Sequence, residues 1–186
     1  MRDALKKLLI ERSVSRGDFV LASGRRSDYY VDCRRTTFHP KGAWLIGRLM
    51  EAEIHNALIR PHQPIHAIGG LTLGADPVAL AIAIASHEMN RPEHPPLRAF
   101  TVRKEAKVHG RGNRIEGSFE PGDRVLVIEY VVTTGSSALS AVTALREAGA
   151  VIAGVMALVD RNEGGREAIE AAGLSLNALF RIGELL

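Results

Sequence analysis

The chain has 186 residues, of which 46% are hydrophobic and 24% charged, and its formal net charge at pH 7 is +3. These values are typical of one soluble globular domain, and no apolar run approaches the roughly 20 residues that a membrane helix needs. Aromatic residues make up 5% of the chain and none is interleaved with a basic run, so we expect neither a membrane protein nor a nucleic-acid-binding protein.

Apolar periodicity and turn residues predict helices and strands that alternate along the chain. In chain order we expect a helix over residues 3–14, strands over 19–21 and 29–32, a helix over 40–58, a strand over 65–69, a helix over 77–89, strands over 97–102 and 124–129, a helix over 138–148, a strand over 151–159, a helix over 164–172 and a strand over 176–179. Gly17 is expected to end the first helix, and Pro40 suits the start of the second. Residues 103–117 are polar and basic, and we expect them to form a loop.

This alternation predicts an α/β fold: a single domain with a mostly parallel central sheet flanked by helices. Ligands of such sheets bind at the carboxyl ends of the strands. The mild positive charge suits a pocket for an anionic small molecule. Loops that follow the predicted strands are therefore the places to look for a site.

The start of the chain and its cysteine content indicate a cytoplasmic location. The N-terminal apolar stretch is too short for a signal peptide and is interrupted by acids. The single cysteine, Cys33, excludes an internal disulfide and suits a reducing compartment. We expect Cys33 to be a small buried residue rather than a nucleophile, because no base lies near it in the sequence.

Glycines follow the strand predicted over residues 65–69, in the segment Gly69 to Asp76. Glycine allows backbone N–H groups to approach a phosphate closely. The same residues also suit a tight turn from strand to helix, and the sequence leaves both interpretations open.

A cluster of cations follows the strand predicted over residues 97–102. Arg103, Lys104, Lys107 and His109 lie within seven residues, and glycines follow them. A basic loop of this kind could close over a pyrophosphate and neutralise charge as that group leaves. The alternative is a solvated surface loop.

Four apolar residues run into Glu129, and a loop of hydroxyls and glycine then leads into a predicted helix. The acid can accept hydrogen bonds from ribose hydroxyls, and the N–H groups of residues 133–137 with the positive end of the helix can hold a phosphate. The segment lacks the Gly-Lys-Ser/Thr of a nucleotide-triphosphate loop and the Gly-x-Gly-x-x-Gly of a dinucleotide fold. A structural strand–turn–helix is the alternative.

These loops together resemble the type I phosphoribosyltransferases, and among them the orotate phosphoribosyltransferases. The resemblance covers nearly the whole chain and is carried by four segments: residues 19–30, like the family's N-terminal hood; 103–110, like its catalytic loop; 129–137, like the motif that binds phosphoribosyl pyrophosphate (PRPP); and 159–161, like the strand end whose arginine holds orotate. It implies one phosphoribosyltransferase domain over residues 1–186, with a hood of about residues 1–40 plus the C-terminal end and a flexible catalytic loop over 103–117.

The resemblance implies that a nitrogen of orotate attacks the anomeric carbon of PRPP, which gives orotidine monophosphate and pyrophosphate and serves pyrimidine biosynthesis. Mg²⁺ would be carried mainly by PRPP, as suits a cation with oxygen ligands, and no dedicated protein metal site is expected. The family shares its basic loop between subunits, which implies a homodimer.

The resemblance also implies a role for each matching residue. The catalytic residues that bind and neutralise pyrophosphate would be Arg103, Lys104, Lys107 and His109. The residues that bind PRPP would be Glu129, Tyr130, Val131, Val132, Thr133, Thr134, Gly135, Ser136 and Ser137. Orotate would contact Thr133, Arg161 and the backbone near Tyr30 and Val31, and a pyrophosphate loop would comprise Gly70, Leu71, Thr72 and Gly74. Arg161 could instead be a surface partner of a neighbouring acid.

Tyr130 departs from the family, which normally has two adjacent acids at the end of this strand. Tyrosine can donate or accept a hydrogen bond, but its ring is bulky and normally neutral. Two alternatives to the orotate enzyme therefore stay open: a weakened or non-catalytic relative that binds ligands or has a regulatory role, and a phosphoribosyltransferase for another base.

Overall fold

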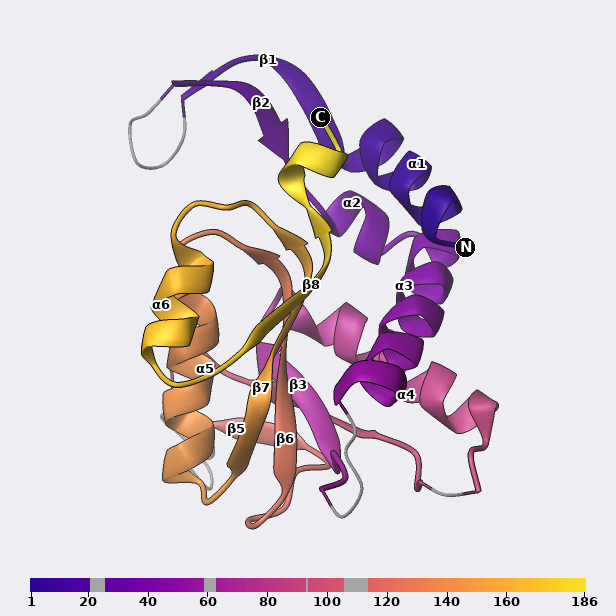
Figure 1. The fold of residues 1–186 in the computed structure, drawn as a ribbon, viewed down its shortest axis with the longest axis vertical. Helices are drawn as coiled ribbons and strands as arrows, with labels where there is room; N and C mark the ends of the chain where they lie inside the picture. The colour runs from indigo at the N-terminus through magenta and orange to yellow at the C-terminus, as the bar shows by residue number, and fades with distance from the viewer. Residues whose placement is uncertain (21–25, 59–62, 93, 106–113) are drawn as a thin grey trace.

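The computed structural model describes residues 1–186 apart from 21–25, 59–62, 93 and 106–113. Its centre is a six-stranded sheet with the strand order β5-β4-β3-β6-β7-β8 (Figure 1). The strands are β3 (Ala67–Leu71), β4 (Arg98–Val102), β5 (Ile115–Gly117), β6 (Arg124–Val132), β7 (Val151–Asp160) and β8 (Leu176–Arg181). All neighbours pair in parallel except β4 and β5, which confirms the predicted α/β fold with a mostly parallel sheet.

Helices cover both faces of the sheet (Figure 1). One face carries α3 (Pro40–Glu53), which continues as a π-helical turn (Ile54–Leu58), and α4 (Ala75–Met89); the other carries α5 (Ser136–Glu147) and α6 (Gly165–Ala171). Two apolar clusters result. Because side chains alternate along a strand, Leu126 and Ile128 belong to the cluster of α3 and α4, whereas Val125 and Val127 belong to that of α5.

The N-terminal segment forms a helix and a separate hairpin. Helix α1 (Arg2–Ser13) leads directly into β1 (Val14–Val20), which pairs antiparallel with β2 (Arg26–Val31), and the short α2 (Arg34–Thr37) follows. In Figure 1 the hairpin stands at one end of the molecule, beside the C-terminus. The carbonyl of Leu186 accepts a hydrogen bond from Arg16 of β1.

Gly17 does not end the first helix, as the sequence predicted. Helix α1 ends at Ser13 because Val14 is already extended and pairs with Val31. Gly17 lies inside β1, where the pairing with β2 shifts between Arg16 and Phe19. The glycine therefore marks an irregularity in a strand rather than a helix end.

Two further predictions need correction. Part of the loop predicted over residues 103–117 forms β5, which pairs with the edge of β4; three residues are too few to give a periodic signal. Strand β6 continues past Glu129 to Val132, because Val131 and Val132 pair with the last residues of β7. Glu129 and Tyr130 therefore lie within the strand and point to opposite faces of the sheet.

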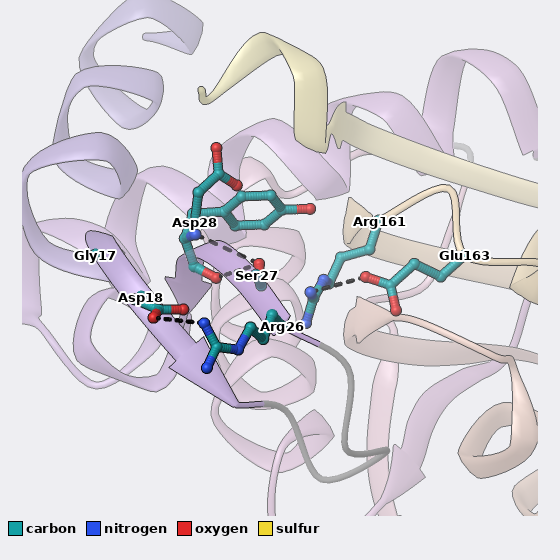
Figure 2. Close-up of a pocket in the computed structure, with 8 residues that line it drawn as sticks. Gly17, Asp18, Arg26, Ser27, Asp28, Arg161 and Glu163 are labelled. Carbon is teal, nitrogen blue, oxygen red and sulfur yellow. Dashed lines mark hydrogen bonds and ion pairs between the residues drawn. The ribbon is translucent and has the colours of Figure 1, made fainter.

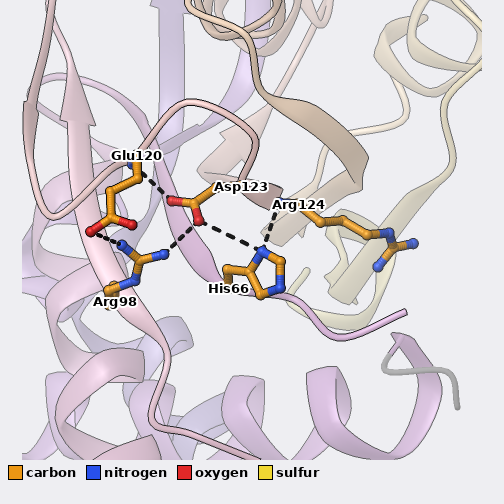
Figure 3. Close-up of polar contacts among 5 residues, drawn as sticks. All are labelled: His66, Arg98, Glu120, Asp123 and Arg124. Atoms are coloured by element: carbon orange, nitrogen blue, oxygen red, sulfur yellow. Dashed lines mark hydrogen bonds and ion pairs between the residues drawn. The ribbon is translucent and has the colours of Figure 1, made fainter. Parts of the chain in front are cut away.

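A polar cluster joins the amino ends of β3, β4 and β6, far along the strands from the loops predicted to bind ligands (Figure 3). Arg98 forms ion pairs with Glu120 (3.1 Å) and with the buried Asp123 (2.5 Å). His66 Nδ1 accepts a hydrogen bond from the backbone N–H of Arg124 at 3.0 Å and lies 3.6 Å from Asp123. These contacts keep the buried carboxylate of Asp123 paired, at the edge of the sheet opposite the predicted ligand-binding loops.

No helix in the described part of the chain is both long and apolar enough to cross a membrane.

Candidate functional site

The order of the central strands brings two of the predicted loops together. The strand order reverses between β3 and β6, which are neighbours, and ligands of open α/β sheets bind beyond the carboxyl ends at such a point. The segment after β3 and the segment after β6 meet there around a cavity of about 190 Å³. The residues that line this cavity, called the central cavity below, are Arg34, Leu71, Thr72, Leu73, Gly74, Lys104, Glu129, Tyr130 and Ser137.

Close packing explains the glycines of the first loop. A Cβ on Gly70 would lie 2.1 Å from the carbonyl oxygen of Ile128, and one on Gly74 would lie 2.0 Å from Cε1 of Tyr130. Gly70 and Leu71 belong to β3, whereas Thr72 and Gly74 belong to the turn before α4. The glycines thus allow a tight turn from strand to helix, which was one of the two interpretations left open by the sequence. Leu71, Thr72 and Gly74 also line the cavity.

Asp76 supports this loop and was missed by the sequence analysis. Its carboxylate accepts hydrogen bonds from the hydroxyls of Thr72, at 2.7 Å, and Thr101. The peptide bond between Thr72 and Leu73 is cis. An acid in the first turn of α4, directly after a glycine-rich loop, was the signal available in the sequence.

Glu129 is a buried carboxyl group that faces the cavity. Its side chain is 4% exposed, and Oε1 has no hydrogen-bond partner in the described part of the chain. Burial raises the pKa of Glu129 to about 8. The group is therefore mostly protonated at pH 7, and a ligand hydroxyl would give it the partner that it lacks.

Tyr130 is half-buried on the other face of β6 and packs against the apolar cluster of α3 and α4. Its ring fills the space beside Gly74. Burial raises the pKa of Tyr130, and the nearby Arg34 opposes that shift. The phenol is therefore uncharged at neutral pH, so position 130 brings no negative charge to the cavity.

Residues 133–137 form the turn between β6 and α5. Gly135 takes the left-handed conformation (φ 79°) before the helix begins at Ser136, and Thr134 Oγ1 lies 3.3 Å from Ser136 Oγ. A small cavity of about 20 Å³ lies here, lined by Glu129, Val131, Val132, Thr133, Gly135, Ser136, Ser137 and Ala138. The predicted PRPP motif thus surrounds one helix N-terminus, where backbone N–H groups suit a phosphate.

The basic loop predicted over residues 103–117 is described at its two ends, residues 103–105 and 114–117. Lys104 lines the central cavity, whereas Arg103 makes a two-point ion pair with Glu116 of β5, at 3.0 and 3.3 Å. The sequence analysis missed Glu116, because the pairing depends on the antiparallel strand. The other two predicted cations, Lys107 and His109, lie outside the described residues.

Arg161 follows β7 and borders a second, larger cavity of about 760 Å³ under the hairpin (Figure 2). Its guanidinium lies 2.7 Å from Glu163 and 5.7 Å from the ring centroid of Tyr29. The Nε atom is buried without a hydrogen-bond partner among the described residues. The lining consists of Gly17, Asp18, Arg26, Ser27, Asp28, Tyr29, Arg161 and Glu163, and is called the hairpin cavity below.

The two predicted orotate contacts on the hairpin, Tyr30 and Val31, do not line this cavity. Tyr30 is partly exposed and its ring packs at 5.7 Å from that of Phe19, whereas Val31 is buried in the core. Tyr29 faces the hairpin cavity instead. The hairpin segment that the sequence analysis singled out does border this cavity, but the sequence could not tell which face of a two-stranded hairpin would be covered.

Cys33 takes no part in the chemistry of these cavities. It is fully buried, and burial raises the pKa of its thiol to about 12. A thiol with that pKa supplies almost no thiolate at neutral pH, as expected for a structural cysteine. Among the described residues, no group of three or more His, Cys, Asp or Glu side chains is placed to hold a metal ion.

Comparison with known proteins shows close relatives over the full length of the chain. An orotate phosphoribosyltransferase of Aquifex aeolicus is 50% identical over 188 residues, which cover 100% of this chain and 97% of the relative. The crystal structure of the Mycobacterium tuberculosis orotate phosphoribosyltransferase with Fe(III) dicitrate matches with a TM-score of 0.83 at 45% identity, covering 99% of this chain and 98% of that one. The same enzyme in complex with PRPP matches with a TM-score of 0.79 at 43% identity and the same coverage. No model of a known protein family matches the chain.

Proposed function

The chain belongs to the orotate phosphoribosyltransferase family, and we propose that it works as that enzyme with the residues described above. It transfers the phosphoribosyl group of PRPP to orotate and yields orotidine monophosphate and pyrophosphate. The observation that carries the assignment is that segments after β3, β4 and β6 line one cavity at the carboxyl edge of the sheet, in a chain that matches the family from end to end. The relatives do not favour a non-catalytic ligand-binding protein.

The β6–α5 turn is the proposed site of the ribose 5-phosphate. Thr133 to Ser137 surround the N-terminus of a 12-residue helix, and several of these residues carry hydroxyls. Glu129 lines both this turn and the central cavity, so it lies where a ribose would join the two. We assign it the ribose hydroxyls, because its Oε1 lacks a partner among the described residues.

The central cavity is the proposed site of the pyrophosphate. Leu71, Thr72 and Gly74 supply backbone on one side and Lys104 a positive charge on the other. During transfer the nitrogen of orotate loses its proton to solvent and bonds to the anomeric carbon, and the bond from that carbon to the pyrophosphate oxygen breaks with its electrons on oxygen. A cation at the leaving group stabilises this charge, and Lys107 and His109 are proposed to join Lys104 in that role.

The hairpin cavity is the proposed site of orotate. Arg161 lies at the cavity wall with a side chain that is 10% exposed and a buried Nε, and a guanidinium binds a carboxylate with two parallel hydrogen bonds. Orotate would have to share Arg161 with Glu163, its partner in the structure. Tyr29 offers a ring face, and the backbone of Tyr30 and Val31 remains a proposed contact with the base.

Mg²⁺ is the proposed cofactor and would arrive with PRPP. A hard cation prefers oxygen ligands and keeps several waters, and the pyrophosphate and ribose oxygens of PRPP supply such ligands. Glu129 suits the ribose hydroxyls beside the ion, because its unpartnered carboxyl faces the cavity. When bound, the ion would neutralise part of the pyrophosphate charge, while Lys104 holds the group in place.

We also propose a homodimer with the basic loop shared between subunits. An apolar patch, called the α3–α4 face, is formed by Trp44, Leu80 and Ile84, which are 53%, 58% and 53% exposed. Trp44 and Ile84 line a common groove, and Arg48 and Glu88 form an ion pair beside it. An apolar centre with a charged rim is the usual anatomy of a protein interface.

We also propose a domain assignment and a cellular location for this protein. We propose that residues 1–186 work as one phosphoribosyltransferase domain, whose hood comprises about residues 1–40 and the C-terminal end. Contacts of Arg2 with Glu184 and of Arg16 with Leu186 join these segments. A reducing cytoplasm suits the free, buried Cys33.

Turnover tests the proposal directly. Folded protein incubated with orotate, PRPP and Mg²⁺ should consume orotate and release an equal amount of pyrophosphate.

Arg161→Gln should raise the KM for orotate. Arg146→Gln, a change at an exposed residue at the far end of α5, should leave this KM unchanged. Uracil and purine bases, tested in place of orotate, should react poorly. Absence of turnover by folded protein would contradict the activity, and faster turnover of another base would change the acceptor.

A further inference from the structure

We infer that Arg34 binds the pyrophosphate group of PRPP, and that Asp32 acts as its positioning residue; the inference rests on the proposed function. Arg34 opens the short helix α2, at the end of the N-terminal segment. It lines the central cavity together with Lys104 and the turn after β3, although these parts are far apart in the sequence. No motif in the sequence singled out this arginine.

The charges around the central cavity favour an anion. Two of its lining residues, Arg34 and Lys104, are cations, and the single carboxyl group among the described lining residues is Glu129. Because burial raises the pKa of Glu129 to about 8, this carboxyl is mostly uncharged at pH 7. Asp32 pairs with Arg34 from outside the lining, and Lys104 has no such partner among the described residues, so the balance of charge at the cavity stays positive and favours an anion such as pyrophosphate.

Asp32 holds the guanidinium of Arg34 in a fixed orientation. Its two carboxylate oxygens accept hydrogen bonds from Nε at 2.8 Å and Nη2 at 3.2 Å, and Oδ1 also accepts from the backbone N–H of Arg34 at 3.2 Å. Nη1 has no hydrogen-bond partner among the described residues, and the side chain is 50% exposed. A guanidinium already held in place loses less conformational freedom when a phosphate oxygen binds to Nη1.

The arrangement of the three cavities assigns this cation to pyrophosphate rather than to the other parts of the substrates. Arg34 is absent from the lining of the small cavity at residues 133–137, where the 5-phosphate is placed. It is also absent from the hairpin cavity, which contains Arg161 and is placed for orotate. Only the central cavity combines Arg34 with Thr72, Gly74 and Lys104, the proposed pyrophosphate contacts.

The test compares Arg34→Gln with Arg35→Gln, an exposed neighbour on the same helix that lines none of the three cavities. A hydrogen bond to a charged group is worth about 1.5–3 kcal/mol, which corresponds to a roughly 10- to 100-fold loss of affinity. Arg34→Gln should raise the KM for PRPP, and for pyrophosphate in the reverse reaction, by about this factor. The KM values of Arg34→Gln for orotate and orotidine monophosphate should stay within about twofold of the parent. The same holds for Arg35→Gln with all four compounds: PRPP, pyrophosphate, orotate and orotidine monophosphate.

Asp32→Asn separates positioning from charge, because Arg34 keeps its charge but loses its ionic partner. We expect a smaller rise in the KM for pyrophosphate, with orotate unaffected. Arg34→Lys keeps the charge without the planar group and should fall between the parent and Arg34→Gln. A similar rise in all four KM values of Arg34→Gln would indicate a structural role and overturn the inference, as would no change.

A binding measurement keeps this inference separate from the proposed function. Calorimetric titration with Mg²⁺-pyrophosphate should give weaker binding to Arg34→Gln than to the parent, whether or not the protein turns over. A parent that turns over while both proteins bind pyrophosphate equally would overturn the role of Arg34 alone. A parent without turnover that binds pyrophosphate through Arg34 would instead overturn the proposed function alone.

Discussion

Position 130 carries an uncharged phenol where the family usually has a second acid beside Glu129. Because β6 continues to Val132, the two side chains point to opposite faces of the sheet, and Tyr130 occupies the space beside Gly74. Both residues still line the central cavity. If the proposed function holds, the negative charge available for ribose hydroxyls depends on Glu129, a group that burial keeps mostly protonated at neutral pH.

We expect Tyr130→Asp to raise kcat/KM for PRPP by roughly ten- to a hundredfold, because a carboxylate makes stronger hydrogen bonds to hydroxyls than a neutral group does. Steady-state kinetics with orotate saturating would measure the change. Tyr130→Phe removes only the phenol oxygen and serves as the control for loss of a hydrogen bond at this position. Equal kcat/KM for Tyr130→Asp and the parent would mean that Glu129 and the β6–α5 turn suffice.

The raised pKa of Glu129 predicts a pH dependence of stability. The folded pKa is about 8 and the unfolded value about 4.5, so the native state binds the extra proton between these values. The free energy of unfolding should therefore fall as the pH rises from about 4.5 to 8, by at most about 1.4 kcal/mol per pH unit. Urea unfolding at pH 5, 6, 7 and 8 should give a shallower fall for Glu129→Gln. Parallel profiles for the two proteins would contradict a shifted pKa at this residue.

At the scale of elements, the turn between β3 and α4 is built against β6. Gly74 precedes the helix at φ −80°, a conformation open to any residue, so only the neighbouring ring of Tyr130 requires glycine there. The identity of residue 130 thus also affects the loop proposed to bind pyrophosphate. An aspartate at 130 would leave more room in this turn, because its side chain is shorter than that of tyrosine.

Gly74→Ala should destabilise the protein by about 1–3 kcal/mol, because its Cβ would lie 2.0 Å from Cε1 of Tyr130. The cost should be at least about 1 kcal/mol smaller in a Tyr130→Ala background. Denaturant unfolding of the two single variants and the double variant would measure this coupling. Gly183→Ala is the control, since nothing lies within 4 Å of its added Cβ. An equal cost in both backgrounds would show that the ring is not what excludes a side chain.

At the scale of the whole molecule, the α3–α4 face is an exposed apolar surface on the outer side of two helices whose inner sides pack on the sheet. Leu80 and Ile84 are four residues apart on α4 and therefore share one side of the helix. Trp44 of α3 reaches the same groove as Ile84. A second copy of the chain is the partner that we propose for this face.

Leu80→Asp should convert the dimer to a monomer, because a charge at the centre of an apolar interface would lose its water on association. Sedimentation velocity would measure the molecular mass, and turnover should fall if the basic loop serves the partner's site. Ile10→Asp, at an exposed apolar position on α1, should change neither property. A parent that sediments as a monomer, or a dimeric Leu80→Asp variant, would contradict the proposed interface.

Much of the site was predictable because its chemistry lies in short contiguous segments. Residues 133–137 lead into a helix as expected, and Lys104 and Arg161 follow parallel strands at the carboxyl edge, where α/β sheets generally bind ligands. Residues that depend on long-range pairing were missed: Glu116 pairs with Arg103 only because β5 turns back along β4, and Arg34 reaches the central cavity from the N-terminal segment.

Hydrophobic periodicity in the sequence determined the α/β class, because it is a property of local segments. The family was indicated by the resemblance of four short segments to the orotate phosphoribosyltransferases, which the relatives then confirmed. The tertiary structure decided which side chains share a cavity, because that depends on strand order, register and the face to which each residue points. A strand three residues longer than predicted places Glu129 and Tyr130 on opposite faces of the sheet. The side of the hairpin that faces Arg161 decides that Tyr29, and not Tyr30, lines the hairpin cavity. Burial likewise set the pKa of Glu129, which no sequence motif contains.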